Sequence, residues 1–191
     1  KARLSKYYDT NPMNPRERDK LGTKDCWNRR YDLGDEQAQN IGLYNSWEEW
    51  LENEVLIPNG GEENVVYLPL YLYDHGGITM NTTGFSCSWD SGQVGWIYTT
   101  YSEIEREFGQ VTDEVINKVK NILRNEVRIY DDYLRGEVYG FILEEKKTCD
   151  CCGHVEYEEI DSCWGFYGDD LINSIKEYVP REYRDLFEEA V

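Results

Sequence analysis

The sequence predicts an α+β fold: a mixed or antiparallel sheet with one long packed helix, a hairpin and C-terminal helices. Three observations predict this class. Two β-rich runs come before residue 101, one long helical pattern follows, and a pair of strands then leads into two helical segments. Strands that are grouped apart from helices, rather than alternating with them, are typical of α+β proteins. With 191 residues, the chain is expected to form a single domain over residues 1–191.

The first half of the chain predicts a short helix and two strands. Ser46 precedes "WEEWLENEV", and Glu49 follows three residues later, which is the spacing of a capping box. The run "VVYLPLYLYDH", residues 65–75, is apolar on both faces and predicts a central strand. Pro69 within it has no N–H group and therefore indicates an edge or a bulge. "QVGWIYTTY" predicts the second strand.

Two helices are expected next. "SEIEREFG" predicts a helix that is capped by Ser102 and stopped by Gly109. Thr112 then precedes the longest helical pattern, which ends at Gly136. Its apolar side chains recur at helical spacing and are expected to face the core: Val115, Ile116, Val119, Ile122, Leu123, Val127, Tyr130 and Leu134.

The last third of the chain predicts a hairpin and two helices. "EVYGFILEE" and "HVEYEEIDSCWGF" are the two strands of the hairpin, and residues 148–154 form its cysteine-rich tip. "GDDLINSIKEYV" and "REYRDLFEEAV" predict C-terminal helices that Pro180 separates.

The hairpin tip resembles a zinc knuckle. Cys149 and Cys152 form C-x-x-C and are followed by Gly153 and His154. Two thiolates three residues apart on a tight turn can face one zinc ion, which would staple a tip that has no core of its own. His154 is the expected third ligand, and Cys151 is a further candidate, although adjacent residues rarely bind one ion. A remote segment or a second chain would supply what is missing, so a homodimer that shares zinc is one arrangement.

Other uses of the cysteines stay open. The C-x-x-C motif is an alternative redox or disulfide site, or a pair of inert thiols. Cys163 lies eleven residues past Cys152, about 35 Å along an extended strand, and is expected to stay apart from the tip. A second metal site would need four separate residues to converge: Cys26, His75, Cys87 and Cys163. Isolated cysteines of this kind are more often small buried hydrophobes.

One segment offers an enzymatic alternative. Residues 73–95, "YDHGGITMNTTGFSCSWDSGQVG", contain Cys87 as a nucleophile, His75 as its base, and Asp74 or Asp90 to orient the base. A polar, glycine-rich connection between two strands is the structural alternative. The common nucleotide-binding and hydrolase signatures do not occur in the sequence. The sequence therefore predicts a protein without enzymatic activity.

The charge is strongly acidic: 38 Asp and Glu against 20 Lys and Arg, a formal net charge of −18. Residues 1–30 hold nine bases and four acids, a net of +5, so the remainder carries −23 (−18 minus +5). Such a field repels nucleic acid and favours a cationic partner. No run of 18 apolar residues is present, so no membrane span is expected. The acids around the hairpin are the candidate partner-binding residues, with a merely solvated face as the alternative: Glu156, Glu158, Glu159, Asp161, Asp169 and Asp170.

Three stretches carry a resemblance to a known family. "DTNPMNPRERDKLGTKDCWNRRYDLGD", "LPLYLYDHGGITMNTTGFSCSWDSGQVGWIY" and "DSCWGFYGDD" resemble small acidic proteins of phages and mobile elements of Firmicutes, over residues 9–170. The added C-x-x-C-G-H resembles a metal-containing anti-CRISPR protein, an inhibitor of type II-A Cas9. The resemblance implies a phage anti-defence protein in the cytoplasm of the bacterial host, and it assigns no functional residue by position.

The resemblance fits the charge. Cas9 holds its guide and target strands in positively charged channels. A rigid acidic protein that mimics DNA would bind Cas9, or another nucleic-acid-binding host defence protein, stoichiometrically and block the loading of target DNA. The alternatives are a small cysteine-dependent hydrolase or an enzyme that degrades a nucleotide signal, and an accessory protein that regulates another phage or host partner.

Overall fold

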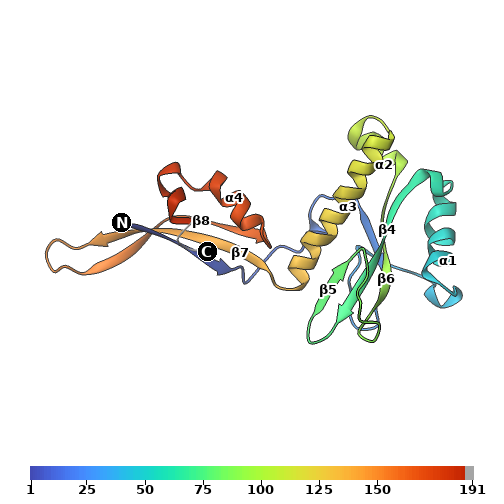
Figure 1. The fold of residues 1–191 in the computed structure, drawn as a ribbon, viewed down its shortest axis with the longest axis horizontal. Coiled ribbons are helices and arrows are strands. Elements are labelled where there is room, and N and C mark those ends of the chain that lie inside the picture. Colours follow the sequence, from blue (N-terminus) through green and yellow to red (C-terminus); the bar gives the residue numbers. More distant parts are fainter. Residues whose placement is uncertain (188–191) are drawn as a thin grey trace. The chain divides into compact units, whose positions relative to one another are not determined.

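The structure is a computed structural model that describes residues 1–187, except the side chains of Ile172 and Phe187 (Figure 1). The chain forms two compact units, each with its own hydrophobic core. The central unit is Asn14–Arg135, and the terminal unit joins Lys1–Met13 to the chain after Arg135. Two compact units do not decide whether the chain unfolds cooperatively, so the expectation of a single domain over 1–191 stays a prediction.

The central unit contains a mixed sheet of five strands in the order β3-β2-β6-β4-β5. β2 and β3 run parallel, whereas the other neighbouring strands are antiparallel. The predicted α+β class, with a mixed sheet and one long helix, is therefore confirmed. The strands are β2 (Thr23–Cys26), β3 (Glu36–Gln37), β4 (Val65–Asp74), β5 (Ile78–Asn81) and β6 (Ser91–Thr100).

β4 explains the proline inside an apolar strand. Its neighbour β5 pairs no earlier than Tyr71, so at Pro69 β4 has only β6 beside it. A bulge follows between Leu70 and Tyr71. Both the edge and the bulge that Pro69 indicated are present, because the missing N–H group is tolerated where a ladder bond is not needed.

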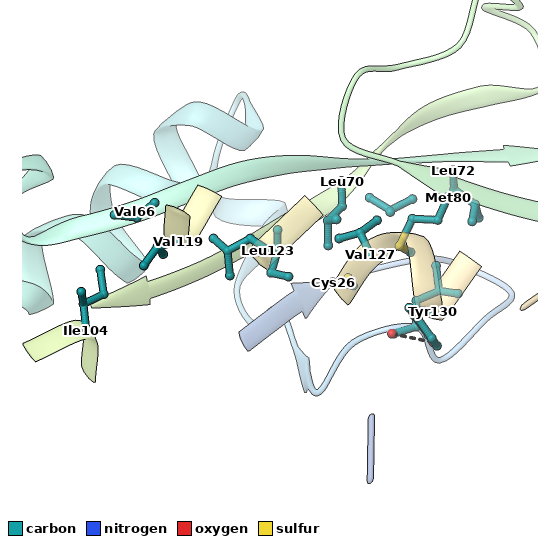
Figure 2. Close-up of a cluster of buried hydrophobic side chains, with 13 residues drawn as sticks. Cys26, Val66, Leu70, Leu72, Met80, Ile104, Val119, Leu123, Val127 and Tyr130 are labelled. Carbon is teal, nitrogen blue, oxygen red and sulfur yellow. Dashed lines mark hydrogen bonds between the residues drawn. The ribbon is translucent and has the colours of Figure 1, made fainter. Parts of the chain in front are cut away.

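Helices cover both faces of this sheet (Figure 1). α3 (Asp113–Leu134) packs on one face, where Val119, Leu123 and Val127 meet apolar side chains of β4 and β6 (Figure 2). α1 (Trp47–Leu51) and the helical turns after it cover the other face, around Trp50 and Trp96. Successive strand residues point to opposite faces, so the mostly apolar run of β4 matches a strand that contributes side chains to the clusters on both faces of the sheet.

The helix caps confirm one prediction and correct another. Thr112 caps α3, since its hydroxyl accepts a hydrogen bond from the Val115 N–H group (3.2 Å). α2 (Tyr101–Phe108) ends at Gly109 as expected, with φ 75°. Its cap is Thr100, which accepts from the Glu103 N–H group at 3.2 Å, so the prediction of Ser102 was wrong. The strand β6 runs directly into the helix, and the first available hydroxyl takes the cap position.

The terminal unit contains an antiparallel sheet in the order β1-β7-β8. β7 (Val138–Thr148) and β8 (Val155–Tyr167) form the predicted hairpin, and β1 (Ala2–Tyr8) adds the third strand. α4 (Asp170–Tyr178) covers one face through Leu171 and Ile175, which with Val179 just after the helix pack on Phe141 and Leu143. The second predicted C-terminal helix is a 3-10 helix over Arg181–Phe187, and residues 188–191 lie outside the described chain.

Candidate metal centre and acidic hairpin

The hairpin tip is a four-residue loop that one glycine makes possible. The Cys149 N–H group donates to the His154 carbonyl, and the Gly153 N–H group donates to the Cys149 carbonyl, both at 2.8 Å. Residues 150–153 therefore connect Cys149 to His154, which lie opposite each other. Gly153 has φ 69°, a left-handed conformation that glycine adopts without the steric cost of a side chain.

This loop gathers three thiols. The Sγ atoms of Cys149, Cys151 and Cys152 all lie within 4.8 Å of one another, and the three residues are exposed. Cys149 Sγ and Cys151 Sγ are only 2.8 Å apart. The cluster can hold a metal ion, because converging thiolates are the preferred ligands of zinc and other soft cations. The expected ligand His154 does not belong to this cluster of ligand atoms as described.

The environment of Cys149 favours its thiolate. Hydrogen bonds from the Cys151 thiol, and then from the N–H groups of Cys151 and Cys152, lower the Cys149 pKa to about 7. The same contact raises the pKa of the Cys151 thiol, because the Cys151 S–H group donates to the Cys149 thiolate and so keeps its proton. Amide groups that point at sulfur fit the zinc-knuckle interpretation of C-x-x-C-G-H. Thiolate is the form that binds metals or attacks electrophiles.

The other cysteines do not add to this cluster. Cys26 is buried in the core of the central unit, and burial raises its pKa to about 12, so it is an inert thiol. Cys163 packs partly against the core of the terminal unit, opposite Phe141. Among the described residues of the central unit, Cys26, His75 and Cys87 form no group of metal-ligating atoms. The second metal constellation is therefore not assembled there.

β8 carries the acidic residues on a free sheet edge. It is the outer strand of its sheet, and residues 155–161 are all exposed. Glu156, Glu158, Glu159 and Asp161 follow one another within this stretch. Lys147 partly neutralises it, with its Nζ 3.5 Å from Glu158 and 3.2 Å from Glu145. Charged side chains on an edge strand also discourage pairing with another copy of the same edge.

Two of the candidate acids lie elsewhere. Asp169 precedes α4, and Asp170 is its first residue. Carboxylates at a helix N-terminus are stabilised by the helix dipole. Asp169 and Asp170 therefore have a structural role at α4 in addition to any contact with a partner.

Apolar side chains alternate with the carboxylates along β8. Val155, Tyr157, Ile160 and Trp164 are each 41–44% exposed. The Arg3 guanidinium lies 3.7 Å from the centre of the Tyr157 ring, and it donates to Glu144 at 2.6 Å. In the β7–β8 register, Tyr157 and Trp164 project to the face opposite that of Glu156, Glu158 and Asp161. The edge strand thus carries half-exposed aromatic rings, a residue type that is enriched at protein interfaces, together with exposed carboxylates that suit a cationic partner.

The glycine-rich segment of the central unit contains part of the proposed triad. His75 Nδ1 lies 3.0 Å from Asp90 Oδ2, so the base and its orienting carboxylate are paired, and both are solvent-exposed. Asp74 instead contacts Arg30 and Tyr31. Cys87 lies in the loop that precedes β6, and its carbonyl accepts from the Ser91 hydroxyl. Trp89, next to Asp90, is 94% exposed.

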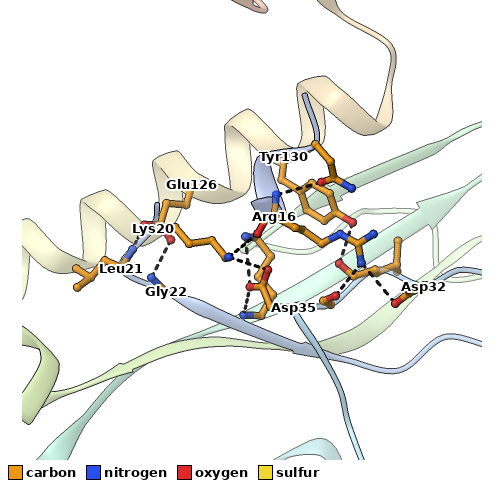
Figure 3. Close-up of polar contacts among 12 residues, drawn as sticks. Arg16, Lys20, Leu21, Gly22, Asp32, Asp35, Glu126 and Tyr130 are labelled. Carbon is orange, nitrogen blue, oxygen red and sulfur yellow. Dashed lines mark hydrogen bonds and ion pairs between the residues drawn. The ribbon is translucent and has the colours of Figure 1, made fainter. Parts of the chain in front are cut away.

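The basic N-terminal stretch is used inside the molecule (Figure 3). Arg16 donates to the Gly34 carbonyl at 2.8 Å and lies 3.4 Å from Asp32. Lys20 lies 3.2 Å from Asp35, which also faces the buried Lys24 at 3.9 Å. Burial lowers the pKa of Lys24.

The Glu126 carboxylate of α3 accepts from two N–H groups of the same basic stretch, at Leu21 and Gly22. These pairs fasten the stretch to α3 and the sheet, a role that the sequence did not predict.

Comparisons with protein-family models, with curated proteins and with solved structures found no match for this chain. None of the described helices is both long enough and apolar enough to cross a membrane.

Proposed function

We propose that the protein is a non-catalytic binding protein whose acidic hairpin docks onto a cationic, nucleic-acid-handling host protein, with type II-A Cas9 as the expected partner. One observation supports this most directly. β8 places four exposed carboxylates on the free edge of a sheet, with half-exposed apolar side chains between them. We call residues 155–164 of β8 the acidic edge.

The acidic edge combines two useful properties. Its carboxylates can replace phosphates on a surface built for nucleic acid, and long-range attraction speeds the encounter. Its rings, such as Tyr157 and Trp164, can be desolvated on contact and supply most of the binding energy. Because such a partner works in the bacterial cytoplasm, the protein is proposed to act there as a DNA mimic of phage origin.

Zinc is the metal that we assign to the cluster of three thiols. Its role is structural, since the tip projects from the sheet and has no hydrophobic core to order it. We propose no enzymatic activity, because docking alone would block the loading of target DNA onto the partner.

Titration of the purified protein into a Cas9–guide complex tests the docking proposal. We expect target binding and cleavage to be blocked near a one-to-one ratio, with weaker inhibition as salt rises, because salt screens exposed charges. Inhibition far below stoichiometry would indicate catalysis and contradict the proposal. Failure to bind Cas9 at low salt would exclude this partner.

One observation favours a second candidate function. The pairing of His75, in the turn between β4 and β5, with Asp90 joins an oriented imidazole to the β5–β6 loop that carries Cys87, as a cysteine-dependent hydrolase or a nucleotide-signal-degrading enzyme would require. Under this alternative, Cys87→Ala abolishes function and leaves the fold intact. Under the docking proposal, the same variant inhibits its partner as well as the wild-type protein does, and Cys163→Ala serves as the control.

A further inference from the structure

We propose that Cys149, Cys151, Cys152 and His154 of a single chain form a closed, four-ligand zinc site that orders the projecting end of the hairpin. This inference rests on the zinc assignment made above. It adds the fourth ligand, the number of chains in the site, and the consequence of metal binding for the acidic edge.

The three thiols alone leave a structural zinc site incomplete. Zinc in structural sites is almost always tetrahedral and takes four protein ligands, with Cys3His among the common sets. The sulfurs of Cys149, Cys151 and Cys152 supply three. Since no other described side chain joins them as a group of ligand atoms, the fourth ligand must reach the cluster by a change of rotamer or come from another molecule.

His154 is placed to reach the cluster. Its carbonyl accepts from the Cys149 N–H group at 2.8 Å, so the two residues face each other one position beyond the last pair of β7 and β8. Opposed residues of an antiparallel pair project to the same face, with Cβ atoms roughly 5 Å apart. Zinc lies about 2.3 Å from a cysteine sulfur and about 2.0 Å from an imidazole nitrogen, so that spacing suits one ion between them. Rotation of an exposed imidazole meets no packed core.

The donor set also selects the metal. Three thiolates and one imidazole suit zinc, whereas calcium and magnesium prefer oxygen ligands. A site with four protein ligands has no open position for water or substrate, which makes the ion structural rather than catalytic. Such a site also leaves no coordination position for a ligand from a second chain, so the protein is expected to bind one zinc ion as a monomer.

The consequence reaches the acidic edge. β1 pairs with β7 only as far as Glu145, and the last contact of this strand is from the Lys146 N–H group to the Lys1 carbonyl. Beyond it, β7 and β8 continue as a two-stranded ribbon to the pair Thr148 and Val155. A ribbon of two strands is marginally stable in water. Zinc at its tip fixes the register there, and so fixes the direction in which Glu156 and its neighbours point.

Metal titration of the full chain tests this inference. Reduced protein is titrated with Zn²⁺ against a chromophoric chelator and with Co²⁺ as a spectroscopic probe. Sedimentation reports the oligomeric state, and amide hydrogen exchange reports order in residues 146–157. The variants are His154→Ala and Cys149→Ser, with His75→Ala and Cys163→Ser as matched controls.

The wild type and both controls are expected to bind one Zn²⁺ per monomer and to gain exchange protection at the ribbon. His154→Ala should bind zinc at least about tenfold more weakly, with a changed Co²⁺ spectrum, and Cys149→Ser should lose most binding. A His154→Ala spectrum identical to that of the wild type, or zinc-driven dimerisation, overturns the single-chain site. If the wild type binds no zinc, the inference and the zinc assignment both fail, while docking of the metal-free protein onto Cas9 would leave the docking proposal standing.

Discussion

At Gly140 the absence of a side chain decides where an aromatic ring lies. Gly140 faces Trp164 in the β7–β8 register, and a Cβ atom at this position would overlap the indole ring of Trp164. We expect Gly140→Ala to lower the free energy of unfolding by about 1–3 kcal/mol, because the ring must move from its packed position. Chemical denaturation measures the change. Gly92→Ala in β6 is the control, since a Cβ atom there meets nothing within 4 Å, and equal losses in both variants would refute the explanation.

The carboxyl group of Asp25 is expected to make the stability of the folded protein depend on pH. Burial, and then the nearby charges of Glu36, Glu54 and Asp35, raise the pKa of its carboxyl to about 6. The folded protein therefore binds this proton more tightly than the unfolded chain does. The stabilisation is full below about pH 4 and is lost as pH rises through about 6.

Asp25→Asn should therefore gain stability relative to the wild type as pH rises from 4 to 7. We expect about 1 kcal/mol, a discounted figure because the carboxyl is only partly buried. Urea denaturation of both proteins across this range measures the difference, with the exposed Asp19→Asn as control. If the difference in unfolding free energy between the two proteins does not change with pH, the pKa of Asp25 is not raised in the folded protein.

At the scale of elements, the start of α2 separates two neighbouring hydroxyls. Thr100 caps the helix in the structure, whereas Ser102 lies inside its first turn and is exposed. Thr100→Ala should cost about 1 kcal/mol of stability, because the Glu103 N–H group loses its acceptor. Ser102→Ala should change stability by less than about 0.5 kcal/mol. Thermal or denaturant unfolding measures the stability loss of each variant. A larger loss in Ser102→Ala than in Thr100→Ala would place the cap at Ser102.

The elements that the sequence predicted well carry long signals. α3 has a helical apolar stripe over six turns, β4 and β6 have continuous apolar runs, and the hairpin strands flank a marked turn. β1 was not predicted, because only Leu4 is buried in "ARLSKYY" and the strand depends on pairing with β7. The short strands β2, β3 and β5 likewise depend on their neighbours in the sheet.

The candidate site was predictable as residues but not as geometry. The C-x-x-C spacing identified Cys149 and Cys152, whereas adjacency argued against Cys151. The four-residue loop turns the Cys151 sulfur toward Cys149, which depends on the left-handed Gly153 and on no pattern of side chains. The sequence offered Asp74 or Asp90 as the partner of His75, and the structure pairs His75 with Asp90.

At the scale of the whole molecule, a net charge of −18 makes salt act in two opposite directions. Salt screens the repulsion among the carboxylates and should raise the melting temperature by a few degrees between about 20 and 200 mM NaCl. The same screening should weaken capture of a cationic partner. Scanning calorimetry and binding assays over one salt series measure both trends. A melting temperature that falls with salt would mean that favourable ion pairs outweigh the repulsion.

The central claim is that the acidic edge, rather than the overall charge, captures the partner. The most direct measurement is the affinity for the Cas9–guide complex of two variants with the same change in net charge. One reverses Glu156, Glu158, Glu159 and Asp161 to lysine, and the other reverses the exposed Glu52, Glu63, Glu105 and Glu107 of the central unit. We predict that the first variant loses at least about a hundredfold in affinity, whereas the second loses less than about tenfold. Equal losses, or no loss in the first variant, would contradict the claim.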